Sequence, residues 1–199
     1  METSGIRRQV AVLLFMLLVA GAWSSVCAYE SGESCTGIKL GFIGSGGVDV
    51  DRGSVEQQAG LSAGFFFDLP LGSRLHYGLS TDLHRMSWTG ERLTYQVDET
   101  GWLLDLGVNL KGDFMSDNSP LGFRPGVGAG VGFLGKMDGL GVAGSSFLIL
   151  RTFAEIVYAS PSDLMFILEG GVWYAPSGGD NVTDVSIGPL FLLRGGVMF

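Results

Sequence analysis

The chain is poor in charged residues. Asp, Glu, Lys and Arg make up only 16% of it, whereas hydrophobic residues make up 46%. Soluble domains carry about a quarter charged residues, so a surface that faces water on all sides is disfavoured. Long apolar runs are also missing, because no run after Ala22 approaches the roughly 18 residues of a membrane-spanning helix. Both an ordinary soluble domain and a helical membrane domain are therefore disfavoured.

Cysteine is scarce as well. The chain has two, Cys27 and Cys35. If Cys27 leaves with a signal peptide, Cys35 has no partner for an internal disulfide and no cysteine cluster for a metal. We expect Cys35 to be a bystander near the mature N-terminus, and we predict no metal site and no cofactor.

The N-terminus has the layout of a secretory signal. Arg7 and Arg8 precede an apolar stretch over 10–22, and small residues follow up to Ala28. A membrane anchor is the first alternative, but 13 residues span only about 20 Å of a hydrocarbon core of about 30 Å. A lipoprotein acylated at Cys27 is the second, and Val26 is unusual before such a cysteine. We predict a cleaved signal over 1–28 and a single domain over 29–199.

An exported hydrophobic chain without membrane helices can satisfy its backbone in lipid as a closed β-barrel. Such a barrel needs segments of about 10 residues that alternate between apolar and small or polar residues. The segment 102–111 alternates in this way, with Leu104 and Leu106 on one face and Asp105 and Gly107 on the other. The chain is also rich in glycine, with 33 residues, and the second face is glycine-rich in most segments. The fold predicted is therefore an all-β, eight-stranded antiparallel up-and-down transmembrane β-barrel.

Eight such segments can be read along the chain. The connections after the second, fourth and sixth are compact turns, and the others are longer, as in outer-membrane barrels. Both termini then lie at the end with the short turns. The predicted strands are 36–45, 58–68, 74–86, 101–113, 122–134, 147–158, 164–175 and 184–199, and the longer connections are 46–57, 87–100, 135–146 and 175–183.

The signal, the eight alternating segments and the aromatic last residue, Phe199, together resemble the small eight-stranded outer-membrane β-barrel family, which includes OmpX, OmpW and the membrane domain of OmpA. The resemblance covers 36–199. It implies a porin-like fold at the cell surface, in the outer membrane of a Gram-negative-type envelope. It also implies that periplasmic chaperones and the barrel-assembly machinery handle the chain. The assembly signal would lie on one face of the last strand, with Val185 and Ile187 in phase; its expected residues are Phe191, Leu193, Val197 and Phe199.

The interior of an eight-stranded barrel is only wide enough for side chains. We therefore expect small residues inside, together with charges kept in pairs, and a sealed or very narrow lumen. Arg124, at the start of its strand, is expected to reach water. A lower cluster is predicted at Lys39, Glu155, Glu169 and Arg194, and an upper cluster at Asp82, Asp105 and Arg151.

No catalytic residue is predicted, and we expect no enzyme activity. His76 and His84 share the inward face, but eight residues on a strand span about 26 Å, too far to share a metal. His84 and Asp82 could form a base with its orienting group, yet no third member is evident. Two glycine motifs, 130–135 and 139–144, match a nucleotide-binding pattern without the strand, turn and helix that it needs.

The long connections are expected to form an acidic rim, which disfavours nucleic acid as a partner. The rim would suit divalent cations or basic host or surface ligands, and outer-membrane lipid would surround the wall. We expect a role in surface interaction or structure. One alternative is an OmpW-like narrow channel for small hydrophobic solutes. The other is a soluble, lipocalin-like ligand-binding barrel with the apolar face inside. The expected acidic residues are Asp49, Asp51, Glu56, Glu91, Asp98, Glu99, Asp138, Asp180 and Asp184, against Arg52, Arg92 and Lys136.

Overall fold

The computed structural model describes residues 33–51, 53–92, 95–115, 119–135, 137, 144–160, 164–179 and 183–199. The predicted signal peptide lies outside these residues. Within them the regular structure consists of strands, all paired antiparallel in one sheet. Among the described residues, no helix is long and apolar enough to cross a membrane.

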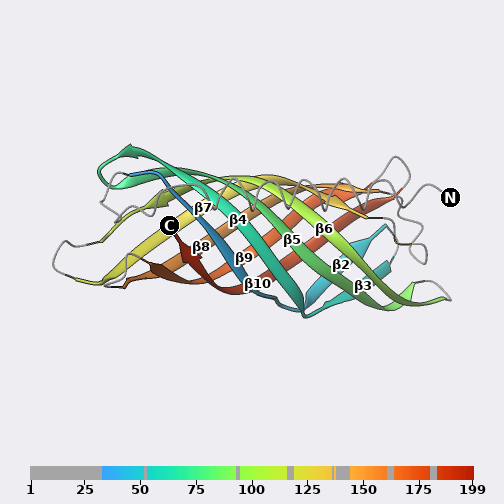
Figure 1. Cartoon of the computed structure of the whole chain (residues 1–199). Coiled ribbons are helices and arrows are strands. Elements are labelled where there is room, and N and C mark those ends of the chain that lie inside the picture. Colours follow the sequence, from blue (N-terminus) through green and yellow to red (C-terminus); the bar gives the residue numbers. More distant parts are fainter. Residues whose placement is uncertain are drawn as a thin grey trace, which may run out of the picture.

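The sheet has ten strands. They are tilted and wrap into an elongated barrel (Figure 1). The strands are β1 (Cys35–Ile43), β2 (Gly46–Val50), β3 (Gly53–Gln58), β4 (Gly60–Gly72), β5 (Leu75–Arg92), β6 (Tyr95–Gly112), β7 (Leu121–Leu134), β8 (Ser146–Ala159), β9 (Met165–Gly179) and β10 (Asp184–Met198).

The ten strands form a ring of eight. β2 continues β1 along β10, because the pairing runs from Ile43 opposite Leu192 to Val48 opposite Ile187 without a change of register. β3 extends the line of β4 beside β5, with a shift of one residue in the register. The pairing of β1 with β10 closes the ring. The predicted eight-stranded antiparallel barrel is therefore confirmed, with two of its strands interrupted.

Two of the predicted long connections are wrong, and a third, 175–183, is shorter than predicted because β9 continues to Gly179. Residues 46–57 form the β2–β3 hairpin, in which Val50 pairs with Gly53. Asp51, at the tip, has a left-handed backbone (φ 41°), a conformation that Asp and Asn tolerate better than most residues. Residues 87–100 belong largely to β5 and β6, which pair as far as Arg92 and Tyr95. We call this end of the barrel the hairpin end, and the opposite end, where β4 turns into β5, the turn end.

The alternation of side chains shifts phase in several strands near the hairpin end. In β10 the register changes between Ile187 and Leu190, and both side chains are fully buried. Such β-bulges are common at barrel rims, and Pro189 cannot donate a ladder hydrogen bond. Val185 and Ile187 therefore point into the barrel, and the prediction that they share a face with Phe191 is wrong.

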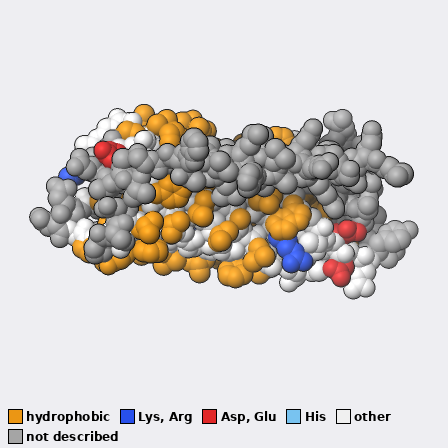
Figure 2. All heavy atoms as spheres, in the orientation of Figure 1, with side chains coloured by type: hydrophobic (Ala, Val, Ile, Leu, Met, Phe, Trp, Pro, Cys, Tyr) orange, Lys and Arg blue, Asp and Glu red, His pale blue; other side chains and the backbone are white. Residues whose placement is uncertain are grey.

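The outside of the barrel carries an apolar belt. In Figure 2 hydrophobic side chains predominate over the visible middle of the wall, and most of the charged side chains in view lie nearer the ends. Phe191 on β10 is 75% exposed and Leu40 on β1 is 64% exposed. A soluble lipocalin-like barrel would have its apolar face inside, so this arrangement counts against that alternative. Other members of the belt are Phe42, Leu61, Leu79, Trp102, Leu106, Val131, Ile156 and Phe166.

The interior is layered along the barrel axis. A small apolar cluster lies near the turn end and includes Phe66, Ile167 and Met198. Charged residues fill the middle. Toward the hairpin end the interior is apolar, so the expectation of small residues and charges throughout is wrong there. We call this upper layer the apolar core; it contains Ile43, Val48, Val50, Val55, Met86, Trp88, Val97, Leu103, Leu134, Met137, Phe147, Ile149, Trp173, Ala175, Val185, Ile187, Leu190 and Leu192.

Polarity inverts along the wall. At the hairpin end, Val48 and Val50 point inward, while Asp49 between them is exposed. Asp98 on β6 and Glu56 on β3 are exposed at the same end. Lower in the barrel the apolar residues point outward and the charges inward. The upper part is thus built like a water-soluble barrel, and the part below it like a barrel in lipid.

Candidate functional site

The middle of the barrel holds ten buried charged side chains, five cationic and five anionic. We call them the ion-pair network. Successive side chains of a strand point to opposite faces. Each member therefore points inward, because its neighbours in the strand lie on the outer face that forms the apolar belt. The members are Lys39, Lys111, Arg124, Arg151 and Arg194 with Asp68, Asp82, Asp105, Glu155 and Glu169.

Arg151 on β8 reaches two carboxylates of the predicted upper cluster. Its Nη1 donates to Asp82 Oδ2 at 2.7 Å, and its Nη2 donates to Asp105 Oδ1 at 3.4 Å. The second oxygen of Asp105 accepts a hydrogen bond of 3.1 Å from Trp173 Nε1. These contacts join β5, β6, β8 and β9 across the lumen.

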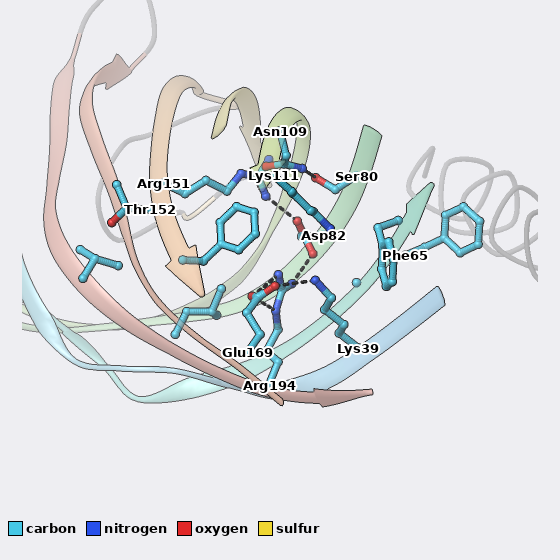
Figure 3. A pocket seen from close by; sticks show the side chains of 15 residues that line it. Lys39, Phe65, Ser80, Asp82, Asn109, Lys111, Arg151, Thr152, Glu169 and Arg194 are labelled. Atoms are coloured by element: carbon cyan, nitrogen blue, oxygen red, sulfur yellow. Dashed lines mark hydrogen bonds and ion pairs between the residues drawn. The ribbon is translucent and has the colours of Figure 1, made fainter. Parts of the chain in front are cut away.

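Arg194 on β10 links the upper and lower predicted clusters. The register places it directly opposite Glu169 on β9, and its Nε and Nη2 donate to Glu169 Oε1 at 2.8 and 2.6 Å. Its Nη1 also donates to Asp82. Two separate clusters were predicted, whereas the structure joins them through this guanidinium. Figure 3 shows Arg194 between Glu169 and Asp82.

Lys39 on β1 joins the other side of the barrel. Its Nζ donates to Glu169 Oε2 at 2.5 Å and to Glu155 Oε1 on β8. The strands β1 and β8 are not neighbours in the ring, so this contact also crosses the lumen. The four residues of the predicted lower cluster are therefore linked by contacts: Lys39, Glu155, Glu169 and Arg194.

Three members of the network lie outside the two predicted clusters: Lys111, Arg124 and Asp68. Lys111 Nζ donates to Asp68 Oδ2 at 2.9 Å and to Glu155 Oε1 at 3.1 Å. Arg124, expected to reach water, is fully buried, and its Nη2 donates to Asp68 Oδ2 at 2.6 Å. Lys111 is on the same face of its strand as Asp105, and Asp68 is at the end of an alternating segment. A search for inward charges at strand ends would therefore have found Lys111 and Asp68.

Aromatic rings line the lower part of the network. The ammonium groups of Lys39 and Lys111 lie 4.5 Å from the centre of the Phe66 ring. Both also approach Phe153, at 5.8 and 5.6 Å. Cation–π attraction adds to the ion pairs when such groups are desolvated.

Glycines make room for the large charged side chains. A Cβ on Gly107 would overlap the guanidinium of Arg151, and a Cβ on Gly64 would overlap the Asp82 carboxylate. Small residues on the inward face therefore allow two arginines and their partners to fit in one layer. The cavity among these side chains has a volume of about 20 Å³, room for roughly one water molecule.

The two histidines lie at different levels. His76, near the turn end, has its Nε2 3.3 Å from Asp113 Oδ2. Burial raises the pKa of Asp113, which lies in the turn beyond β6, and the Arg124 guanidinium opposes that rise. His84 lies above the network, next to the apolar core. Among the described residues, no group of three or more His, Cys, Asp or Glu could hold a metal.

The four residues predicted as an assembly signal lie on the last strand and its end. Phe191 and Leu193 are exposed in the apolar belt, and Val197 and Phe199 are partly buried. Phe199 also closes the seam of the barrel, because its N–H donates to Thr36 O at 2.8 Å and its carbonyl accepts from Thr36 N at 2.9 Å.

The predicted acidic rim lies partly on strands. Asp49, Glu56 and Asp98 are exposed on β2, β3 and β6, and Asp51 at the β2–β3 tip accepts a hydrogen bond from Asp184 N at 2.9 Å. Glu91 is exposed and Glu99 half-buried. Of the other expected rim residues, Asp138, Asp180, Arg52 and Lys136 lie outside the described residues, as does the Arg92 side chain.

The fold is similar to that of two solved structures, one of a bacterial surface protein and one of a bacterial outer membrane protein. Neisserial surface protein A superimposes with a TM-score of 0.51 and 13% identity, over 83% of this chain and 95% of that one. The outer membrane protein OprG from Pseudomonas aeruginosa superimposes with a TM-score of 0.51 and 15% identity, over 86% and 98% of the two chains. This chain has the fold of a small outer-membrane β-barrel. The outer-membrane barrel fold spans nearly all of both solved chains. No protein-family model matches the sequence, and no curated protein matches it significantly.

Proposed function

We propose that the protein is an integral outer-membrane β-barrel with a sealed lumen, which acts at the cell surface through its acidic hairpin end. The observation that carries this proposal is the ion-pair network. Its contacts join strands on opposite sides of the ring, and the cavity left among them is about 20 Å³. A charge is kept in such a site only when it is paired, so the network resists opening. The apolar core above it adds a second closed layer.

The hairpin end is the part suited to contact partners. At this end β2, β3, β5 and β6 continue beyond the apolar belt as paired strands, with apolar side chains inside. Their outer face carries Asp49, Glu56 and Asp98. We call this part of the barrel the acidic platform. The acidic platform favours basic surface or host ligands and divalent cations, and repels nucleic acid. The role that follows is surface interaction or a structural contribution to the membrane, without catalysis.

A conduit for small hydrophobic solutes is the second candidate. The apolar lining of the upper interior favours it, because Trp88, Trp173 and Ile149 would suit an apolar solute. Such a solute would still have to leave through the wall or pass the ion-pair network. In the described residues, each strand of the ring hydrogen-bonds to both of its neighbours in the membrane-facing part. This closed pairing counts against an exit between strands.

The test has two steps. The protein, refolded in lipid, is run on a gel with and without boiling; a heat-modifiable band that resists protease is expected for a membrane barrel. It is then placed in a planar bilayer beside an open porin as a positive control. Sealing predicts no conductance steps of porin size. Such steps in the folded protein would contradict the sealed lumen, and a chain that stays soluble without detergent would contradict the membrane location.

The conduit is tested separately, by uptake of a small hydrophobic dye into lipid vesicles with and without the folded protein. Equal uptake supports the sealed barrel, and faster uptake through the protein supports the conduit.

A further inference from the structure

His84 lies at the boundary between the ion-pair network and the apolar core. It is fully buried, and neither ring nitrogen has a hydrogen-bond partner. Ser62, its register partner on β4, is buried too, and its hydroxyl has no partner either. Buried polar groups are normally hydrogen-bonded, so His84 is a group whose interactions can change.

The carboxylate oxygen closest to His84 is already bound by another side chain. His84 Nε2 lies 3.9 Å from Asp105 Oδ2, and the same oxygen accepts the hydrogen bond from Trp173 Nε1 at 3.1 Å. The rings of His84 and Trp173 meet edge to face with centroids 5.9 Å apart. In the structure Trp173 is the donor to this oxygen, and His84 lies just beyond hydrogen-bond distance of it.

Asp105 is the most loosely held carboxylate near His84. Its contact with Arg151 is 3.4 Å long, whereas Arg151 binds Asp82 at 2.7 Å. Asp82, two residues before His84 on β5, is held by both Arg151 and Arg194. A charged His84 would thus find Asp105 more available than Asp82.

We propose that His84 is a proton-responsive group that takes Asp105 Oδ2 from Trp173 when it becomes charged. The charged groups that face it are Asp82 on its own strand, Asp105 on β6, Arg151 on β8 and Arg194 on β10. The strands β4 and β9 contribute only the uncharged Ser62 and Trp173 at this level. Among side chains, histidine most readily changes charge near neutral pH.

The exchange also couples the two layers of the interior. Trp173 belongs to the apolar core, and Asp105 belongs to the ion-pair network. When the imidazolium holds Asp105, the indole loses its only hydrogen-bond acceptor among the described side chains. Proton uptake at His84 would therefore loosen the contact between the sealed layer and the core above it.

The test follows the indole N–H resonance of Trp173 by NMR in the folded, detergent-solubilised protein between pH 8 and 5. Trp173→Phe identifies the resonance, and the lipid-facing Trp102 serves as an internal reference. We expect the Trp173 resonance to shift along a single-proton titration curve while that of Trp102 stays in place. In His84→Asn the Trp173 shift should be lost.

Two results would overturn the proposal. One is a Trp173 resonance that does not move between pH 8 and 5. The other is a shift of the same size and midpoint in His84→Asn, which would assign the titration to another group. If His84→Asn does not fold, His84→Gln provides the same comparison.

Discussion

Arg194 binds carboxylates on two strands that are not neighbours, Glu169 on β9 and Asp82 on β5. Both carboxylate partners are buried, each with only 1% of its surface exposed. In a low-dielectric interior, removing one member of such a pair leaves an uncompensated charge, which costs more than the pair itself contributed.

We therefore predict that Arg194→Ala lowers the free energy of unfolding by about 3–5 kcal/mol, measured by urea unfolding in lipid vesicles. Arg194→Lys should recover part of the loss, because it keeps the charge without the forked geometry. Arg74, which is exposed in the turn between β4 and β5, provides the control: Arg74→Ala should change stability by no more than about 0.5 kcal/mol. Equal losses in the two alanine variants would show that the network does not stabilise the barrel.

The elements differ in how well the sequence predicts them. β7 keeps one alternation throughout, and β6 keeps it from Trp102 to Lys111, so the faces of these segments, and the inward position of Asp105, follow from the residues alone. β10 does not, because the bulge around Pro189 shifts the phase, and a reading of alternate residues cannot detect an added residue. For the same reason the alternation did not reveal the β2–β3 hairpin, because the residues 44–47 interrupt the apolar alternation of β1.

The side-chain contacts of the site are only partly predictable. Register arithmetic places Arg194 level with Glu169. The two residues lie on neighbouring antiparallel strands, Glu169 five residues after the predicted start of one and Arg194 five residues before the end of the other. Register arithmetic cannot show that Arg194 also reaches Asp82, since that contact depends on the width of the closed barrel and on Gly64 leaving space. The burial of Arg124 depends on Asp68 from the far side of the ring in the same way.

The inverted polarity of β2 predicts opposite effects at neighbouring positions. Val48 is fully buried in the apolar core, and Asp49 is exposed. Val48→Ser should lower the free energy of unfolding by about 2–3 kcal/mol, because a buried methyl surface is lost and a hydroxyl enters an apolar layer. Asp49→Ser should change it by less than about 0.5 kcal/mol. Urea unfolding of both variants checks this, and the reverse order would mean that β2 has its faces exchanged.

At the scale of the whole molecule, the last residue has two separable roles. The backbone of Phe199 closes the seam with Thr36, and we propose that its ring is part of the assembly signal. Because Phe199→Ala keeps the backbone, the variant refolded in detergent should melt within a few degrees of the wild type. In cells the amount of assembled barrel should fall several-fold, measured by the heat-modifiable band in outer-membrane fractions.

Phe166→Ala is the matched control for this prediction, since Phe166 is a belt phenylalanine on β9. Its assembled amount should stay near that of the wild type. A similar fall in both variants would show that loss of any aromatic from the belt impairs assembly, without a special role for the last residue.

The ion-pair network also determines how the barrel can form. Apart from Arg194 with Glu169, the principal pairs join strands that are not adjacent: Lys39 with Glu155, Arg124 with Asp68, and Arg151 with Asp82. A hairpin or half-barrel entering lipid would carry charges whose partners are still elsewhere in the chain, and stepwise insertion would be costly. Closure and insertion should therefore occur together, as one cooperative transition without a populated, partly inserted intermediate.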